Sequence, residues 1–358
     1  MAGIKRAERE LYSCHEYKEK KRCPKCFSLK TKKKGFIKSE ITSLRGLISK
    51  KTQRFFCNSC GVSFTSNGYD LRQKTSKQVK EKAVYDYVST KNSLREVADR
   101  FNVSKTSILN WLPIIAKNHS DIHSIQDKTL WSGLIQLDGK ELKIKGVKHV
   151  LLVGSDAISK VPIHYELVTA ENTENSRLFL EHLIQHYHVP IRGIISDFGR
   201  GKCFIKLVQE LFPDIPHQTC LVHFMRYINL FLPRTKKSRY YWRNAVLKWI
   251  IKKVLKASTR EESLEWFNKF INWAPFFKAS YHKRFIQSLL NNYALLTRHY
   301  EHPFLVTNTN IIENTNRQIA RKLKNLDGFK SCCNANHFLH IWFANFTIRI
   351  IMKQTQLS

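Results

Sequence analysis

The chain has 358 residues, with 61 Lys and Arg against 28 Asp and Glu, so its formal net charge is +33. Aliphatic and aromatic residues make up 42%, enough for buried cores, which argues against intrinsic disorder. No apolar run reaches the roughly 18 residues of a membrane-spanning helix, and the first residues are charged, so we expect no membrane segment and no secretion signal. We therefore expect a cytoplasmic protein, nucleoid-associated if prokaryotic, whose nine cysteines are reduced thiols or metal ligands.

The positive charge is concentrated toward the two ends of the chain. Residues 1–130 carry 28 Lys and Arg against 12 Asp and Glu, residues 131–230 carry 11 against 10, and residues 231–358 carry 22 against 6. Basic regions favour a polyanionic partner, because Lys and Arg displace the counterions of nucleic acid phosphates. The distribution predicts DNA as the partner, although a general basic bias would give the same total charge.

Two Cys-x-x-Cys pairs near the N-terminus predict a structural zinc site. The pairs are separated by 30 residues, enough for two or three short strands, and residues 53–57 and 61–64 have strand character. Two such pairs supply four thiolates, the tetrahedral donor set that zinc prefers. A redox-active pair, the alternative, would need only one of them in a βαβ context. The predicted ligands are Cys23, Cys26, Cys57 and Cys60, whereas the nearby Cys14-His15 lacks a matching spacing.

The apolar residues of segment 76–112 recur at helical spacing and predict three helices. The last two of these are expected to form a helix-turn-helix. Ser93 can cap one helix, Asn102 suits the sharp turn, and Ser104 can cap the next. We expect Val103 to be buried between the two helices and Pro113 to end or kink the second. An ordinary helical hairpin has the same pattern, but the basic charge favours DNA binding by the second helix. The residues expected to face DNA are Lys105, Thr106, Ser107 and Asn110.

The central segment has the pattern of a mixed sheet. It begins with three apolar strands separated by short turns, which predict an antiparallel meander, and continues as helix, strand, helix, strand. The predicted strands are 134–144, 147–155, 161–168, 191–197 and 216–220, and the helices are 174–188 and 202–212, the second preceded by a turn at 199–201.

Two aspartates in this segment are candidates for catalysis. Asp138 lies on the first strand and Asp197 ends the fourth, so the two carboxylates meet if these strands are adjacent. That is a ribonuclease-H-like arrangement, in which two divalent cations about 4 Å apart relieve the repulsion and serve phosphodiester chemistry. Oxygen ligands suit Mg²⁺ or Mn²⁺. Asp197 could instead belong to a simple turn, and Asp156 is a possible auxiliary acid.

Glu313 is the predicted third acid. It lies in the first turn of a helix that Thr309 or Asn310 can cap, so a capping box is the structural alternative. Lys322 and Lys324 follow on the same helix, and this basic series is suited to DNA phosphates. The leading candidates for phosphate contact are Arg317 and Arg321.

Four motifs, in this order and at these intervals, resemble those of mutator-type DDE transposases of insertion sequences, within the ribonuclease-H-like superfamily. They are Leu137-Asp138-Gly139, Ile195-Ser196-Asp197, Cys220-Leu221-Val222-His223, and 309–316 followed by 328–331. The resemblance covers about residues 130–335 and implies that Asp138, Asp197 and Glu313 are the metal-binding catalytic residues. It also implies that Cys220 and His223 are structural or adjacent to the active site, and we expect no zinc there.

The long interval between Asp197 and Glu313 looks like the all-α insertion of this family. Helical patterns cover 240–257, 259–273 and 281–297, and we expect the aromatic residues Trp242 and Trp249 to pack in its core. The sequence therefore predicts a multidomain α/β protein. Its parts are a zinc ribbon (1–66), a helix-turn-helix domain (67–127) and a ribonuclease-H-like catalytic domain (128–358) with a helical insertion at about 224–305.

We expect a DNA transposase that binds the ends of its element, cleaves there with metal ions and joins the freed 3′-OH to target DNA. Bringing two ends together implies a homodimer or a higher assembly on DNA. A domesticated, inactive transposase acting as a DNA-binding regulator is the first alternative, although all three acids are present. A ribonuclease-H-type nuclease is the second, and the predicted DNA-binding segments and long insertion argue against it.

Overall fold

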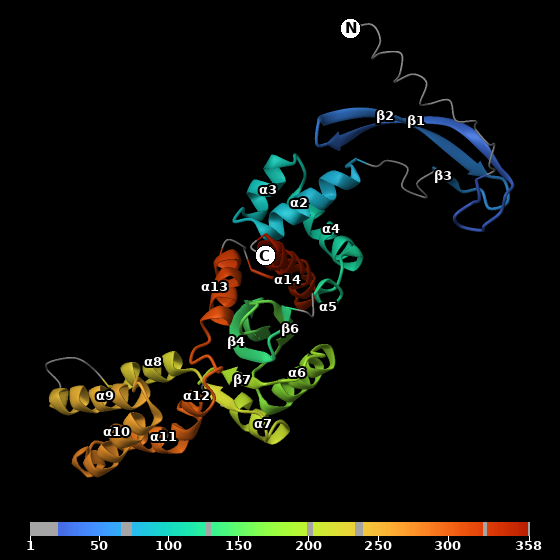
Figure 1. The fold of residues 1–358 in the computed structure, drawn as a ribbon. Coiled ribbons are helices and arrows are strands. Elements are labelled where there is room, and N and C mark those ends of the chain that lie inside the picture. The colour runs from blue at the N-terminus through green and yellow to red at the C-terminus, as the bar shows by residue number, and fades with distance from the viewer. Residues whose placement is uncertain are drawn as a thin grey trace, which may run out of the picture. The chain divides into compact units, whose positions relative to one another are not determined.

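The computed structural model describes residues 21–65, 74–126, 130–198, 203–232, 239–324 and 328–356. The predictions for Cys14-His15 and for the turn at 199–201 lie outside these residues. The chain divides into two compact units (Figure 1): the first comprises residues 1–83 and 98–104, and the second comprises residues 84–97 and 105–358. None of the helices in the described part of the chain is long and apolar enough to cross a membrane.

The first unit contains an antiparallel sheet of three strands. The strands are β1 (Thr31–Ser43), β2 (Gly46–Cys57) and β3 (Ser63–Thr65), in the order β1-β2-β3. Gly46 adopts φ +101° in the tight turn between β1 and β2, a conformation that side chains with a Cβ rarely tolerate. The predicted strands that enter and leave the second cysteine pair are confirmed.

Three helices follow at the predicted positions, α2 (Lys77–Ser89), α3 (Leu94–Arg100) and α4 (Lys105–Asn118), and the short α5 (Ile122–Ile125) comes after them. Ser93 and Glu96 cap α3 reciprocally: the Ser93 N–H donates to the Glu96 carboxylate at 2.6 Å, and the Glu96 N–H donates to Ser93 Oγ at 3.3 Å. Asn102, at φ +50°, makes the turn before α4.

The burial expected for Val103 was wrong, and of the two outcomes expected at Pro113, an end or a kink of the helix, the end does not occur. Pro113 does not end α4, which continues to Asn118. The proline removes one backbone donor, but buried residues on either side of it, Ile108 and Ala116, hold the same face of the helix in the core. Val103 is only partly buried, because it lies in the turn rather than on a helix face.

The second unit is built on a five-stranded mixed sheet in the order β6-β5-β4-β7-β8. The first three strands are antiparallel neighbours, whereas β7 runs parallel to both β4 and β8. This confirms the predicted mixed α/β organisation, and it makes the first and fourth strands neighbours, the condition under which Asp138 and Asp197 were expected to meet. The bounds are β4 (Leu134–Ile144), β5 (Val147–Asp156), β6 (Pro162–Val168), β7 (Gly193–Ser196) and β8 (His217–Thr219).

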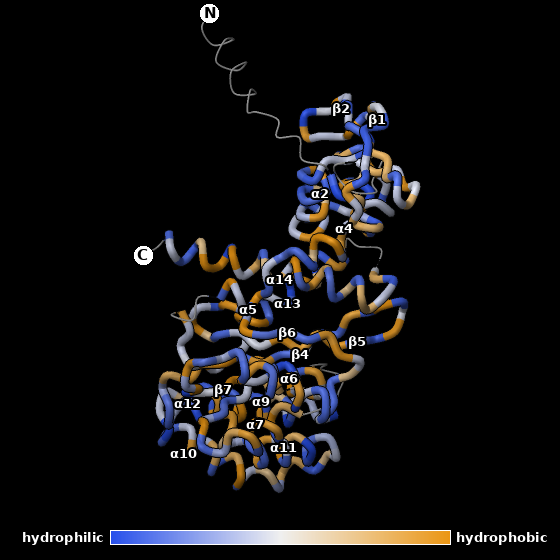
Figure 2. Tube along the Cα trace, turned by 90° about the vertical axis from the view of Figure 1, so that its right-hand side faces the viewer, coloured by the Kyte–Doolittle hydropathy of each residue, from blue (hydrophilic) through white to orange (hydrophobic). Residues whose placement is uncertain are grey.

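Helices cover both faces of this sheet (Figure 1). Helices α6 (Thr173–His186) and α7 (Cys203–Leu211) pack on the face that carries Ile135 and Leu137, and hydrophobic segments gather around α7 and β7 in Figure 2. Helix α13 (Asn310–Lys324) lies against β4, and α14 (Cys332–Thr355) lies against β6. Because successive strand residues alternate between faces, Asp138 shares the α13 face with Gln136.

Between β8 and α13 the chain forms helices with a core of their own, which includes Phe224, Leu247 and Phe270. Trp242 and Trp249 were wrongly expected in that core: they are 78% and 46% exposed. They lie seven residues apart on the α9 face opposite its buried residues. The predicted helices are confirmed as α9 (Tyr241–Leu255), α10 (Arg260–Trp273) and α11 (Ser280–Leu296), preceded by α8 (Leu221–Phe231) and accompanied by η2 (Ala274–Phe276) and α12 (Arg298–Glu301).

Asp156 is a structural residue rather than an auxiliary acid. Its side chain is fully buried and accepts hydrogen bonds from Ser132, Ile158, Ser159 and the Tyr187 hydroxyl, at 2.7 to 3.3 Å. These donors occupy both carboxylate oxygens. The residue therefore ties the segment before β4 and the end of α6 to the β5–β6 turn.

Replacing Asp156 by Ala should lower the free energy of unfolding by about 3–5 kcal/mol, because several buried donors lose their acceptor at once. Urea unfolding followed by circular dichroism measures this change. Asp214→Ala, at an exposed position, is the matched control and should change stability little. Equal stability of the two variants would contradict the structural role of Asp156.

Lys322 does not face DNA phosphates as predicted. It is 6% exposed, donates to the Asn92 carbonyl at 2.9 Å and lies 5.3 Å from the centre of the Tyr87 ring. Burial lowers the pKa of Lys322 to about 8, against partial opposition from two nearby acids. Lys322 therefore joins the end of α13 to the segment before α3.

Lys322 should make stability depend on pH. The folded chain releases its proton near pH 8 and the unfolded chain near 10.5, so stability rises as the pH increases between these values, by up to about 3 kcal/mol. Chemical unfolding at a series of pH values, compared between the native chain and Lys322→Met, isolates this contribution. Lys324→Met, at an exposed position, is the control and should leave the pH dependence intact.

Candidate functional site

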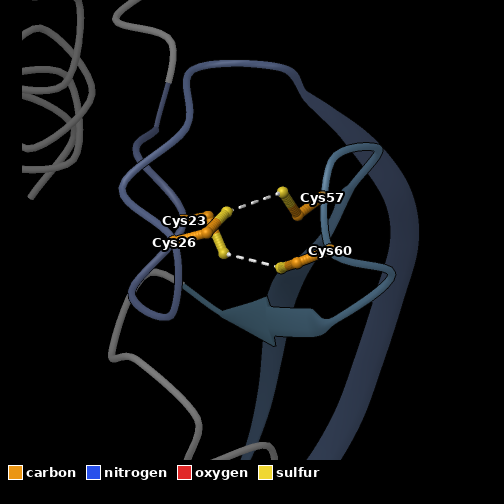
Figure 3. A group of neighbouring side chains, drawn as sticks. All are labelled: Cys23, Cys26, Cys57 and Cys60. Atoms are coloured by element: carbon orange, nitrogen blue, oxygen red, sulfur yellow. Dashed lines mark hydrogen bonds between the residues drawn. The ribbon is translucent and has the colours of Figure 1, made fainter.

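The four cysteines of the first unit converge as a cluster that could hold a zinc ion (Figure 3). Cys23 Sγ lies 3.5 Å from Cys60 Sγ, and Cys26 Sγ lies 3.6 Å from Cys57 Sγ. These separations are close to the roughly 3.8 Å between sulfurs around a tetrahedral zinc with bonds of about 2.3 Å. Burial disfavours the Cys57 thiolate, but hydrogen bonds from the Cys60 and Ser59 N–H groups outweigh it and lower the pKa of Cys57 to about 6.

The parallel pairing of β4 and β7 brings two aspartates together in the second unit. Leu137 is paired with Ser196, the last residue of β7. Asp138 and Asp197 each come one residue later and therefore lie side by side. Asp138 remains on β4, whereas Asp197 follows the last residue of β7. This placement agrees with the expected meeting of a carboxylate on the first strand with one at the end of the fourth.

Asp138 is held in a buried, polar setting. It is 7% exposed, and its carboxylate accepts hydrogen bonds from the Gly139 N–H at 2.9 Å and from the Asn316 side-chain amide at 2.7 Å. Burial, followed by the negative charge of Asp197, raises the pKa of Asp138 to about 7. The two acids therefore repel each other across the strand pair, and a cation between them would relieve that repulsion.

His223 contacts Asp197 from the beginning of α8. Its Nδ1 lies 3.0 Å from Asp197 Oδ1, and the Thr309 hydroxyl lies 3.3 Å from both that nitrogen and the sulfur of Cys220. Burial disfavours the charged imidazole, but the hydrogen bond with Asp197 outweighs it and raises the pKa of His223 to about 10. The Cys-x-x-His motif thus orients one acid of the site and anchors the residue before α13.

Glu313 faces this group from the first turn of α13. Both of its oxygens accept from the Arg226 guanidinium, at 2.9 and 3.3 Å, and Arg317 lies 3.7 Å away. Burial would raise the pKa of Glu313, but the Arg226 hydrogen bonds dominate and lower it. The capping-box alternative does not describe this contact, because Glu313 uses its carboxylate on Arg226 and Thr309 uses its hydroxyl on Cys220 and His223.

Three further residues at this site, Glu171, Arg226 and Asn316, were not predicted from the sequence. Glu171 precedes α6, and its pKa is raised by burial and by the charge of Asp197. A Cβ added at Gly139 would lie only 2.8 Å from a Glu171 oxygen, so this glycine makes room for a fourth acid. Asn316 stands three residues after Glu313 on the same helix, a spacing that could have identified it. No comparable signal marks Arg226 or Glu171.

Gln136 fixes α13 against the sheet. Its amide nitrogen donates to the Asn308 carbonyl at 3.0 Å, and its oxygen accepts from the Ile312 N–H at 3.4 Å. It is fully buried two residues before Asp138 on the same face of β4. Strand β4 therefore carries both Asp138 and Gln136, and Gln136 positions α13, the helix that carries Glu313.

The acids offer carboxylate oxygens, the donor type that Mg²⁺ and Mn²⁺ prefer. A divalent cation bound between Asp138 and Asp197 would relieve the repulsion between their carboxylates. Glu313 is engaged with Arg226, however, and within the described ranges Asp138, Asp197 and Glu313 do not form a group whose ligand atoms all lie within 4.8 Å of one another. Glu313 would have to exchange Arg226 for a cation to complete such a site.

The predicted DNA contacts are mostly at the surface. Lys105, Thr106 and Asn110 are exposed on α4, and Ser107 is partly buried. Arg317 and Arg321 are exposed on α13. A cavity of about 660 Å³ opens beside Arg226, and its lining includes Lys248, Lys252 and Lys256 of the α8–α9 segment.

Comparison with known proteins identifies the class of this chain. The model of the mutator family of transposases matches residues 159–347, more than half of the chain. The chain therefore belongs to the mutator family of transposases. It is 25% identical over 276 residues to the uncharacterized 48.3 kDa protein of insertion element ISM1 from Methanobrevibacter smithii, a match that covers 70% of this chain and 63% of that protein.

The chain also has low similarity to solved structures of an intasome and of a transposase. A simian T-cell lymphotropic virus intasome in complex with PP2A regulatory subunit B56 gamma has 16% identity, covers 62% of this chain and 65% of its own, and has a TM-score of 0.23. The Mos1 transposase paired-end complex with the left transposon end has 13% identity, coverage of 65% and 84%, and a TM-score of 0.20.

Removing Arg226 should free Glu313 for a cation. Because this ion pair is half exposed, its contribution is about 0.5–1 kcal/mol, and Arg226→Gln should tighten Mn²⁺ binding about 2- to 5-fold. The free Mn²⁺ signal in electron paramagnetic resonance measures this change. Arg321→Gln removes an exposed charge further along α13 and should have the smaller effect. Weaker binding in Arg226→Gln would contradict competition for Glu313.

Proposed function

We propose that this protein is a DDE-type DNA transposase that binds the ends of its element, cleaves them and joins them to target DNA. The observation that carries the proposal is the pairing of β4 with β7, which sets Asp138 beside Asp197, with His223 against Asp197 and Arg226 against Glu313. The strand order β6-β5-β4-β7-β8 agrees with a ribonuclease-H-like fold. Membership in the mutator family agrees with the same chemistry.

In this proposal Asp138, Asp197 and Glu313 hold two Mg²⁺ or Mn²⁺ ions. When bound, such ions activate the attacking oxygen and stabilise the leaving oxygen of a phosphodiester. Asn316 fixes the Asp138 carboxylate, and His223 holds Asp197 in place. Arg226 neutralises Glu313 until cations and DNA replace it, and its charge then faces the phosphate backbone.

The proposed DNA contacts come from both basic parts of the chain. We assign residues 1–66 to a zinc ribbon with ligands Cys23, Cys26, Cys57 and Cys60, and residues 67–127 to a helix-turn-helix domain. Residues 128–358 form the catalytic domain with a helical insertion at about 224–305. The exposed α4 residues suit base and phosphate contacts, and Arg317, Arg321 and the lysines beside Arg226 suit phosphates near the acids. Synapsis of two ends requires a homodimer or a higher assembly.

The test uses labelled DNA from the two flanks of the gene, incubated with the full chain in Mg²⁺ or Mn²⁺. Cleavage at the element ends and joining to a target should require the metal. Asp138→Asn, Asp197→Asn and Glu313→Gln should each reduce cleavage by at least about 100-fold while leaving DNA binding intact. Asp214→Asn, at an exposed position, is the matched control.

Three results would contradict parts of the proposal. Metal-independent binding without cleavage by the native chain would favour a DNA-binding regulator. Preferential cutting of RNA–DNA hybrids would favour a nuclease. Cleavage that survives Glu313→Gln but not Glu171→Gln would show that Glu171 is the third acid.

A further inference from the structure

A second group of metal-ligand residues lies apart from the acids, on the α6 face of the sheet. Its members are His164 and Glu166 on the edge strand β6, His182 and His186 on α6, and His123 on α5. Residues two apart share one face of a strand, and residues four apart share one face of a helix. The strand pair and the helix pair therefore face each other where α6 packs on β6.

Three of these side chains converge on one point. Glu166 Oε1 lies 3.0 Å from His164 Nε2 and 2.5 Å from His182 Nδ1. Around a tetrahedral zinc with bonds of about 2.0–2.1 Å, neighbouring ligand atoms are roughly 3.3 Å apart. Slight separation of the three side chains would therefore admit an ion in place of the hydrogen bonds between them.

The other possible set, His123, His164 and His186, fits an ion less well. The His123 and His186 rings are stacked, with centres 3.5 Å apart and planes inclined by 14°. The lone pairs of imidazole lie in the plane of the ring, so those of two nearly parallel rings run side by side and do not meet at one ion. His123 and His186 are therefore better suited to support and orient neighbouring ligands than to bind an ion themselves.

His123 provides that support. Its Nε2 lies 3.3 Å from Nδ1 of His164, the ring nitrogen that Glu166 does not contact. A histidine that binds a metal through one nitrogen commonly donates its other N–H to a neighbour, which fixes the tautomer and orients the ring. The structure thus brings together three candidate ligands and an outer partner for one of them, His164.

We propose that His164, Glu166 and His182 bind a zinc ion that joins α6 to the edge strand β6. Nitrogen and carboxylate ligands suit zinc, and the donor set differs from the four thiolates of the first unit and from the carboxylates of the proposed catalytic site. The side chain of His182 is 48% exposed and that of Glu166 is 22% exposed, so solvent can reach the ion and supply a fourth ligand. The ion would stabilise the α6–β6 contact without taking part in DNA cleavage.

The test is the zinc content of the purified full chain after dialysis, measured by plasma mass spectrometry. We expect the native chain to retain one equivalent more than His182→Ala and one more than Glu166→Gln. Zinc should also raise the unfolding midpoint of the native chain but not that of His182→Ala. His188→Ala is the matched control, since His188 is an exposed histidine just beyond α6 and outside the ligand group, and it should retain all the zinc.

Cobalt substitution distinguishes this site from the others. The Cys57→Ser variant loaded with cobalt should still show the visible absorption of a nitrogen- and oxygen-ligated ion, without a thiolate charge-transfer band. The double variant Cys57→Ser, His182→Ala should lack this absorption. Circular dichroism checks that each variant is folded. The proposal is overturned if His182→Ala keeps the full zinc content, or if the extra zinc is lost from Asp197→Asn instead, which would place it on the acids.

Discussion

Repulsion between two carboxylates is the constraint around which the residues of the candidate site are arranged. The register of β4 against β7 leaves Asp138 and Asp197 side by side, and the burial of Asp138 limits the screening of this repulsion by water. The chain offsets this charge with separate partners: an amide from Asn316, an imidazole from His223 and, further out, the guanidinium of Arg226 on Glu313. The repulsion between the Asp138 and Asp197 carboxylates also makes the site suited to bind a cation, because a cation would relieve it.

Much of the fold was predictable because local sequence patterns mark the strands of the sheet and the turns between them. Apolar alternation and short turns identified the five strands, and helical spacing identified the helices before and after them. Adjacency of the first and fourth strands was only a condition at the sequence level, and the pairing of β4 with β7 meets it and brings Asp138 near Asp197. The errors arose where burial decides a local choice, as for Pro113 inside α4 and for Trp242 and Trp249 on the solvent side of α9.

The candidate site was less predictable, since several of its contacts join residues that no local pattern relates. Arg226 reaches Glu313 across the helical segment, and Glu171 approaches Gly139 only because a loop and a strand pack together. Asp156, which the sequence offered only as a possible auxiliary acid, has both carboxylate oxygens occupied by hydrogen bonds, and no local pattern distinguishes it from the other acids. The roles of Asp138, Asp197 and Glu313 stay predictions until cleavage is measured.

The contacts between β4 and α13 also bear on how the chain folds. Asp138 and Asn316 are 178 residues apart in sequence, and the two Gln136 contacts span 172 and 176 residues. Closing so large a loop costs entropy, and such contacts form late in folding. The helical segment has its own core and can collapse first, which shortens the effective loop. The site is therefore completed last, so a nascent chain has no assembled acid cluster until α13 has been synthesised.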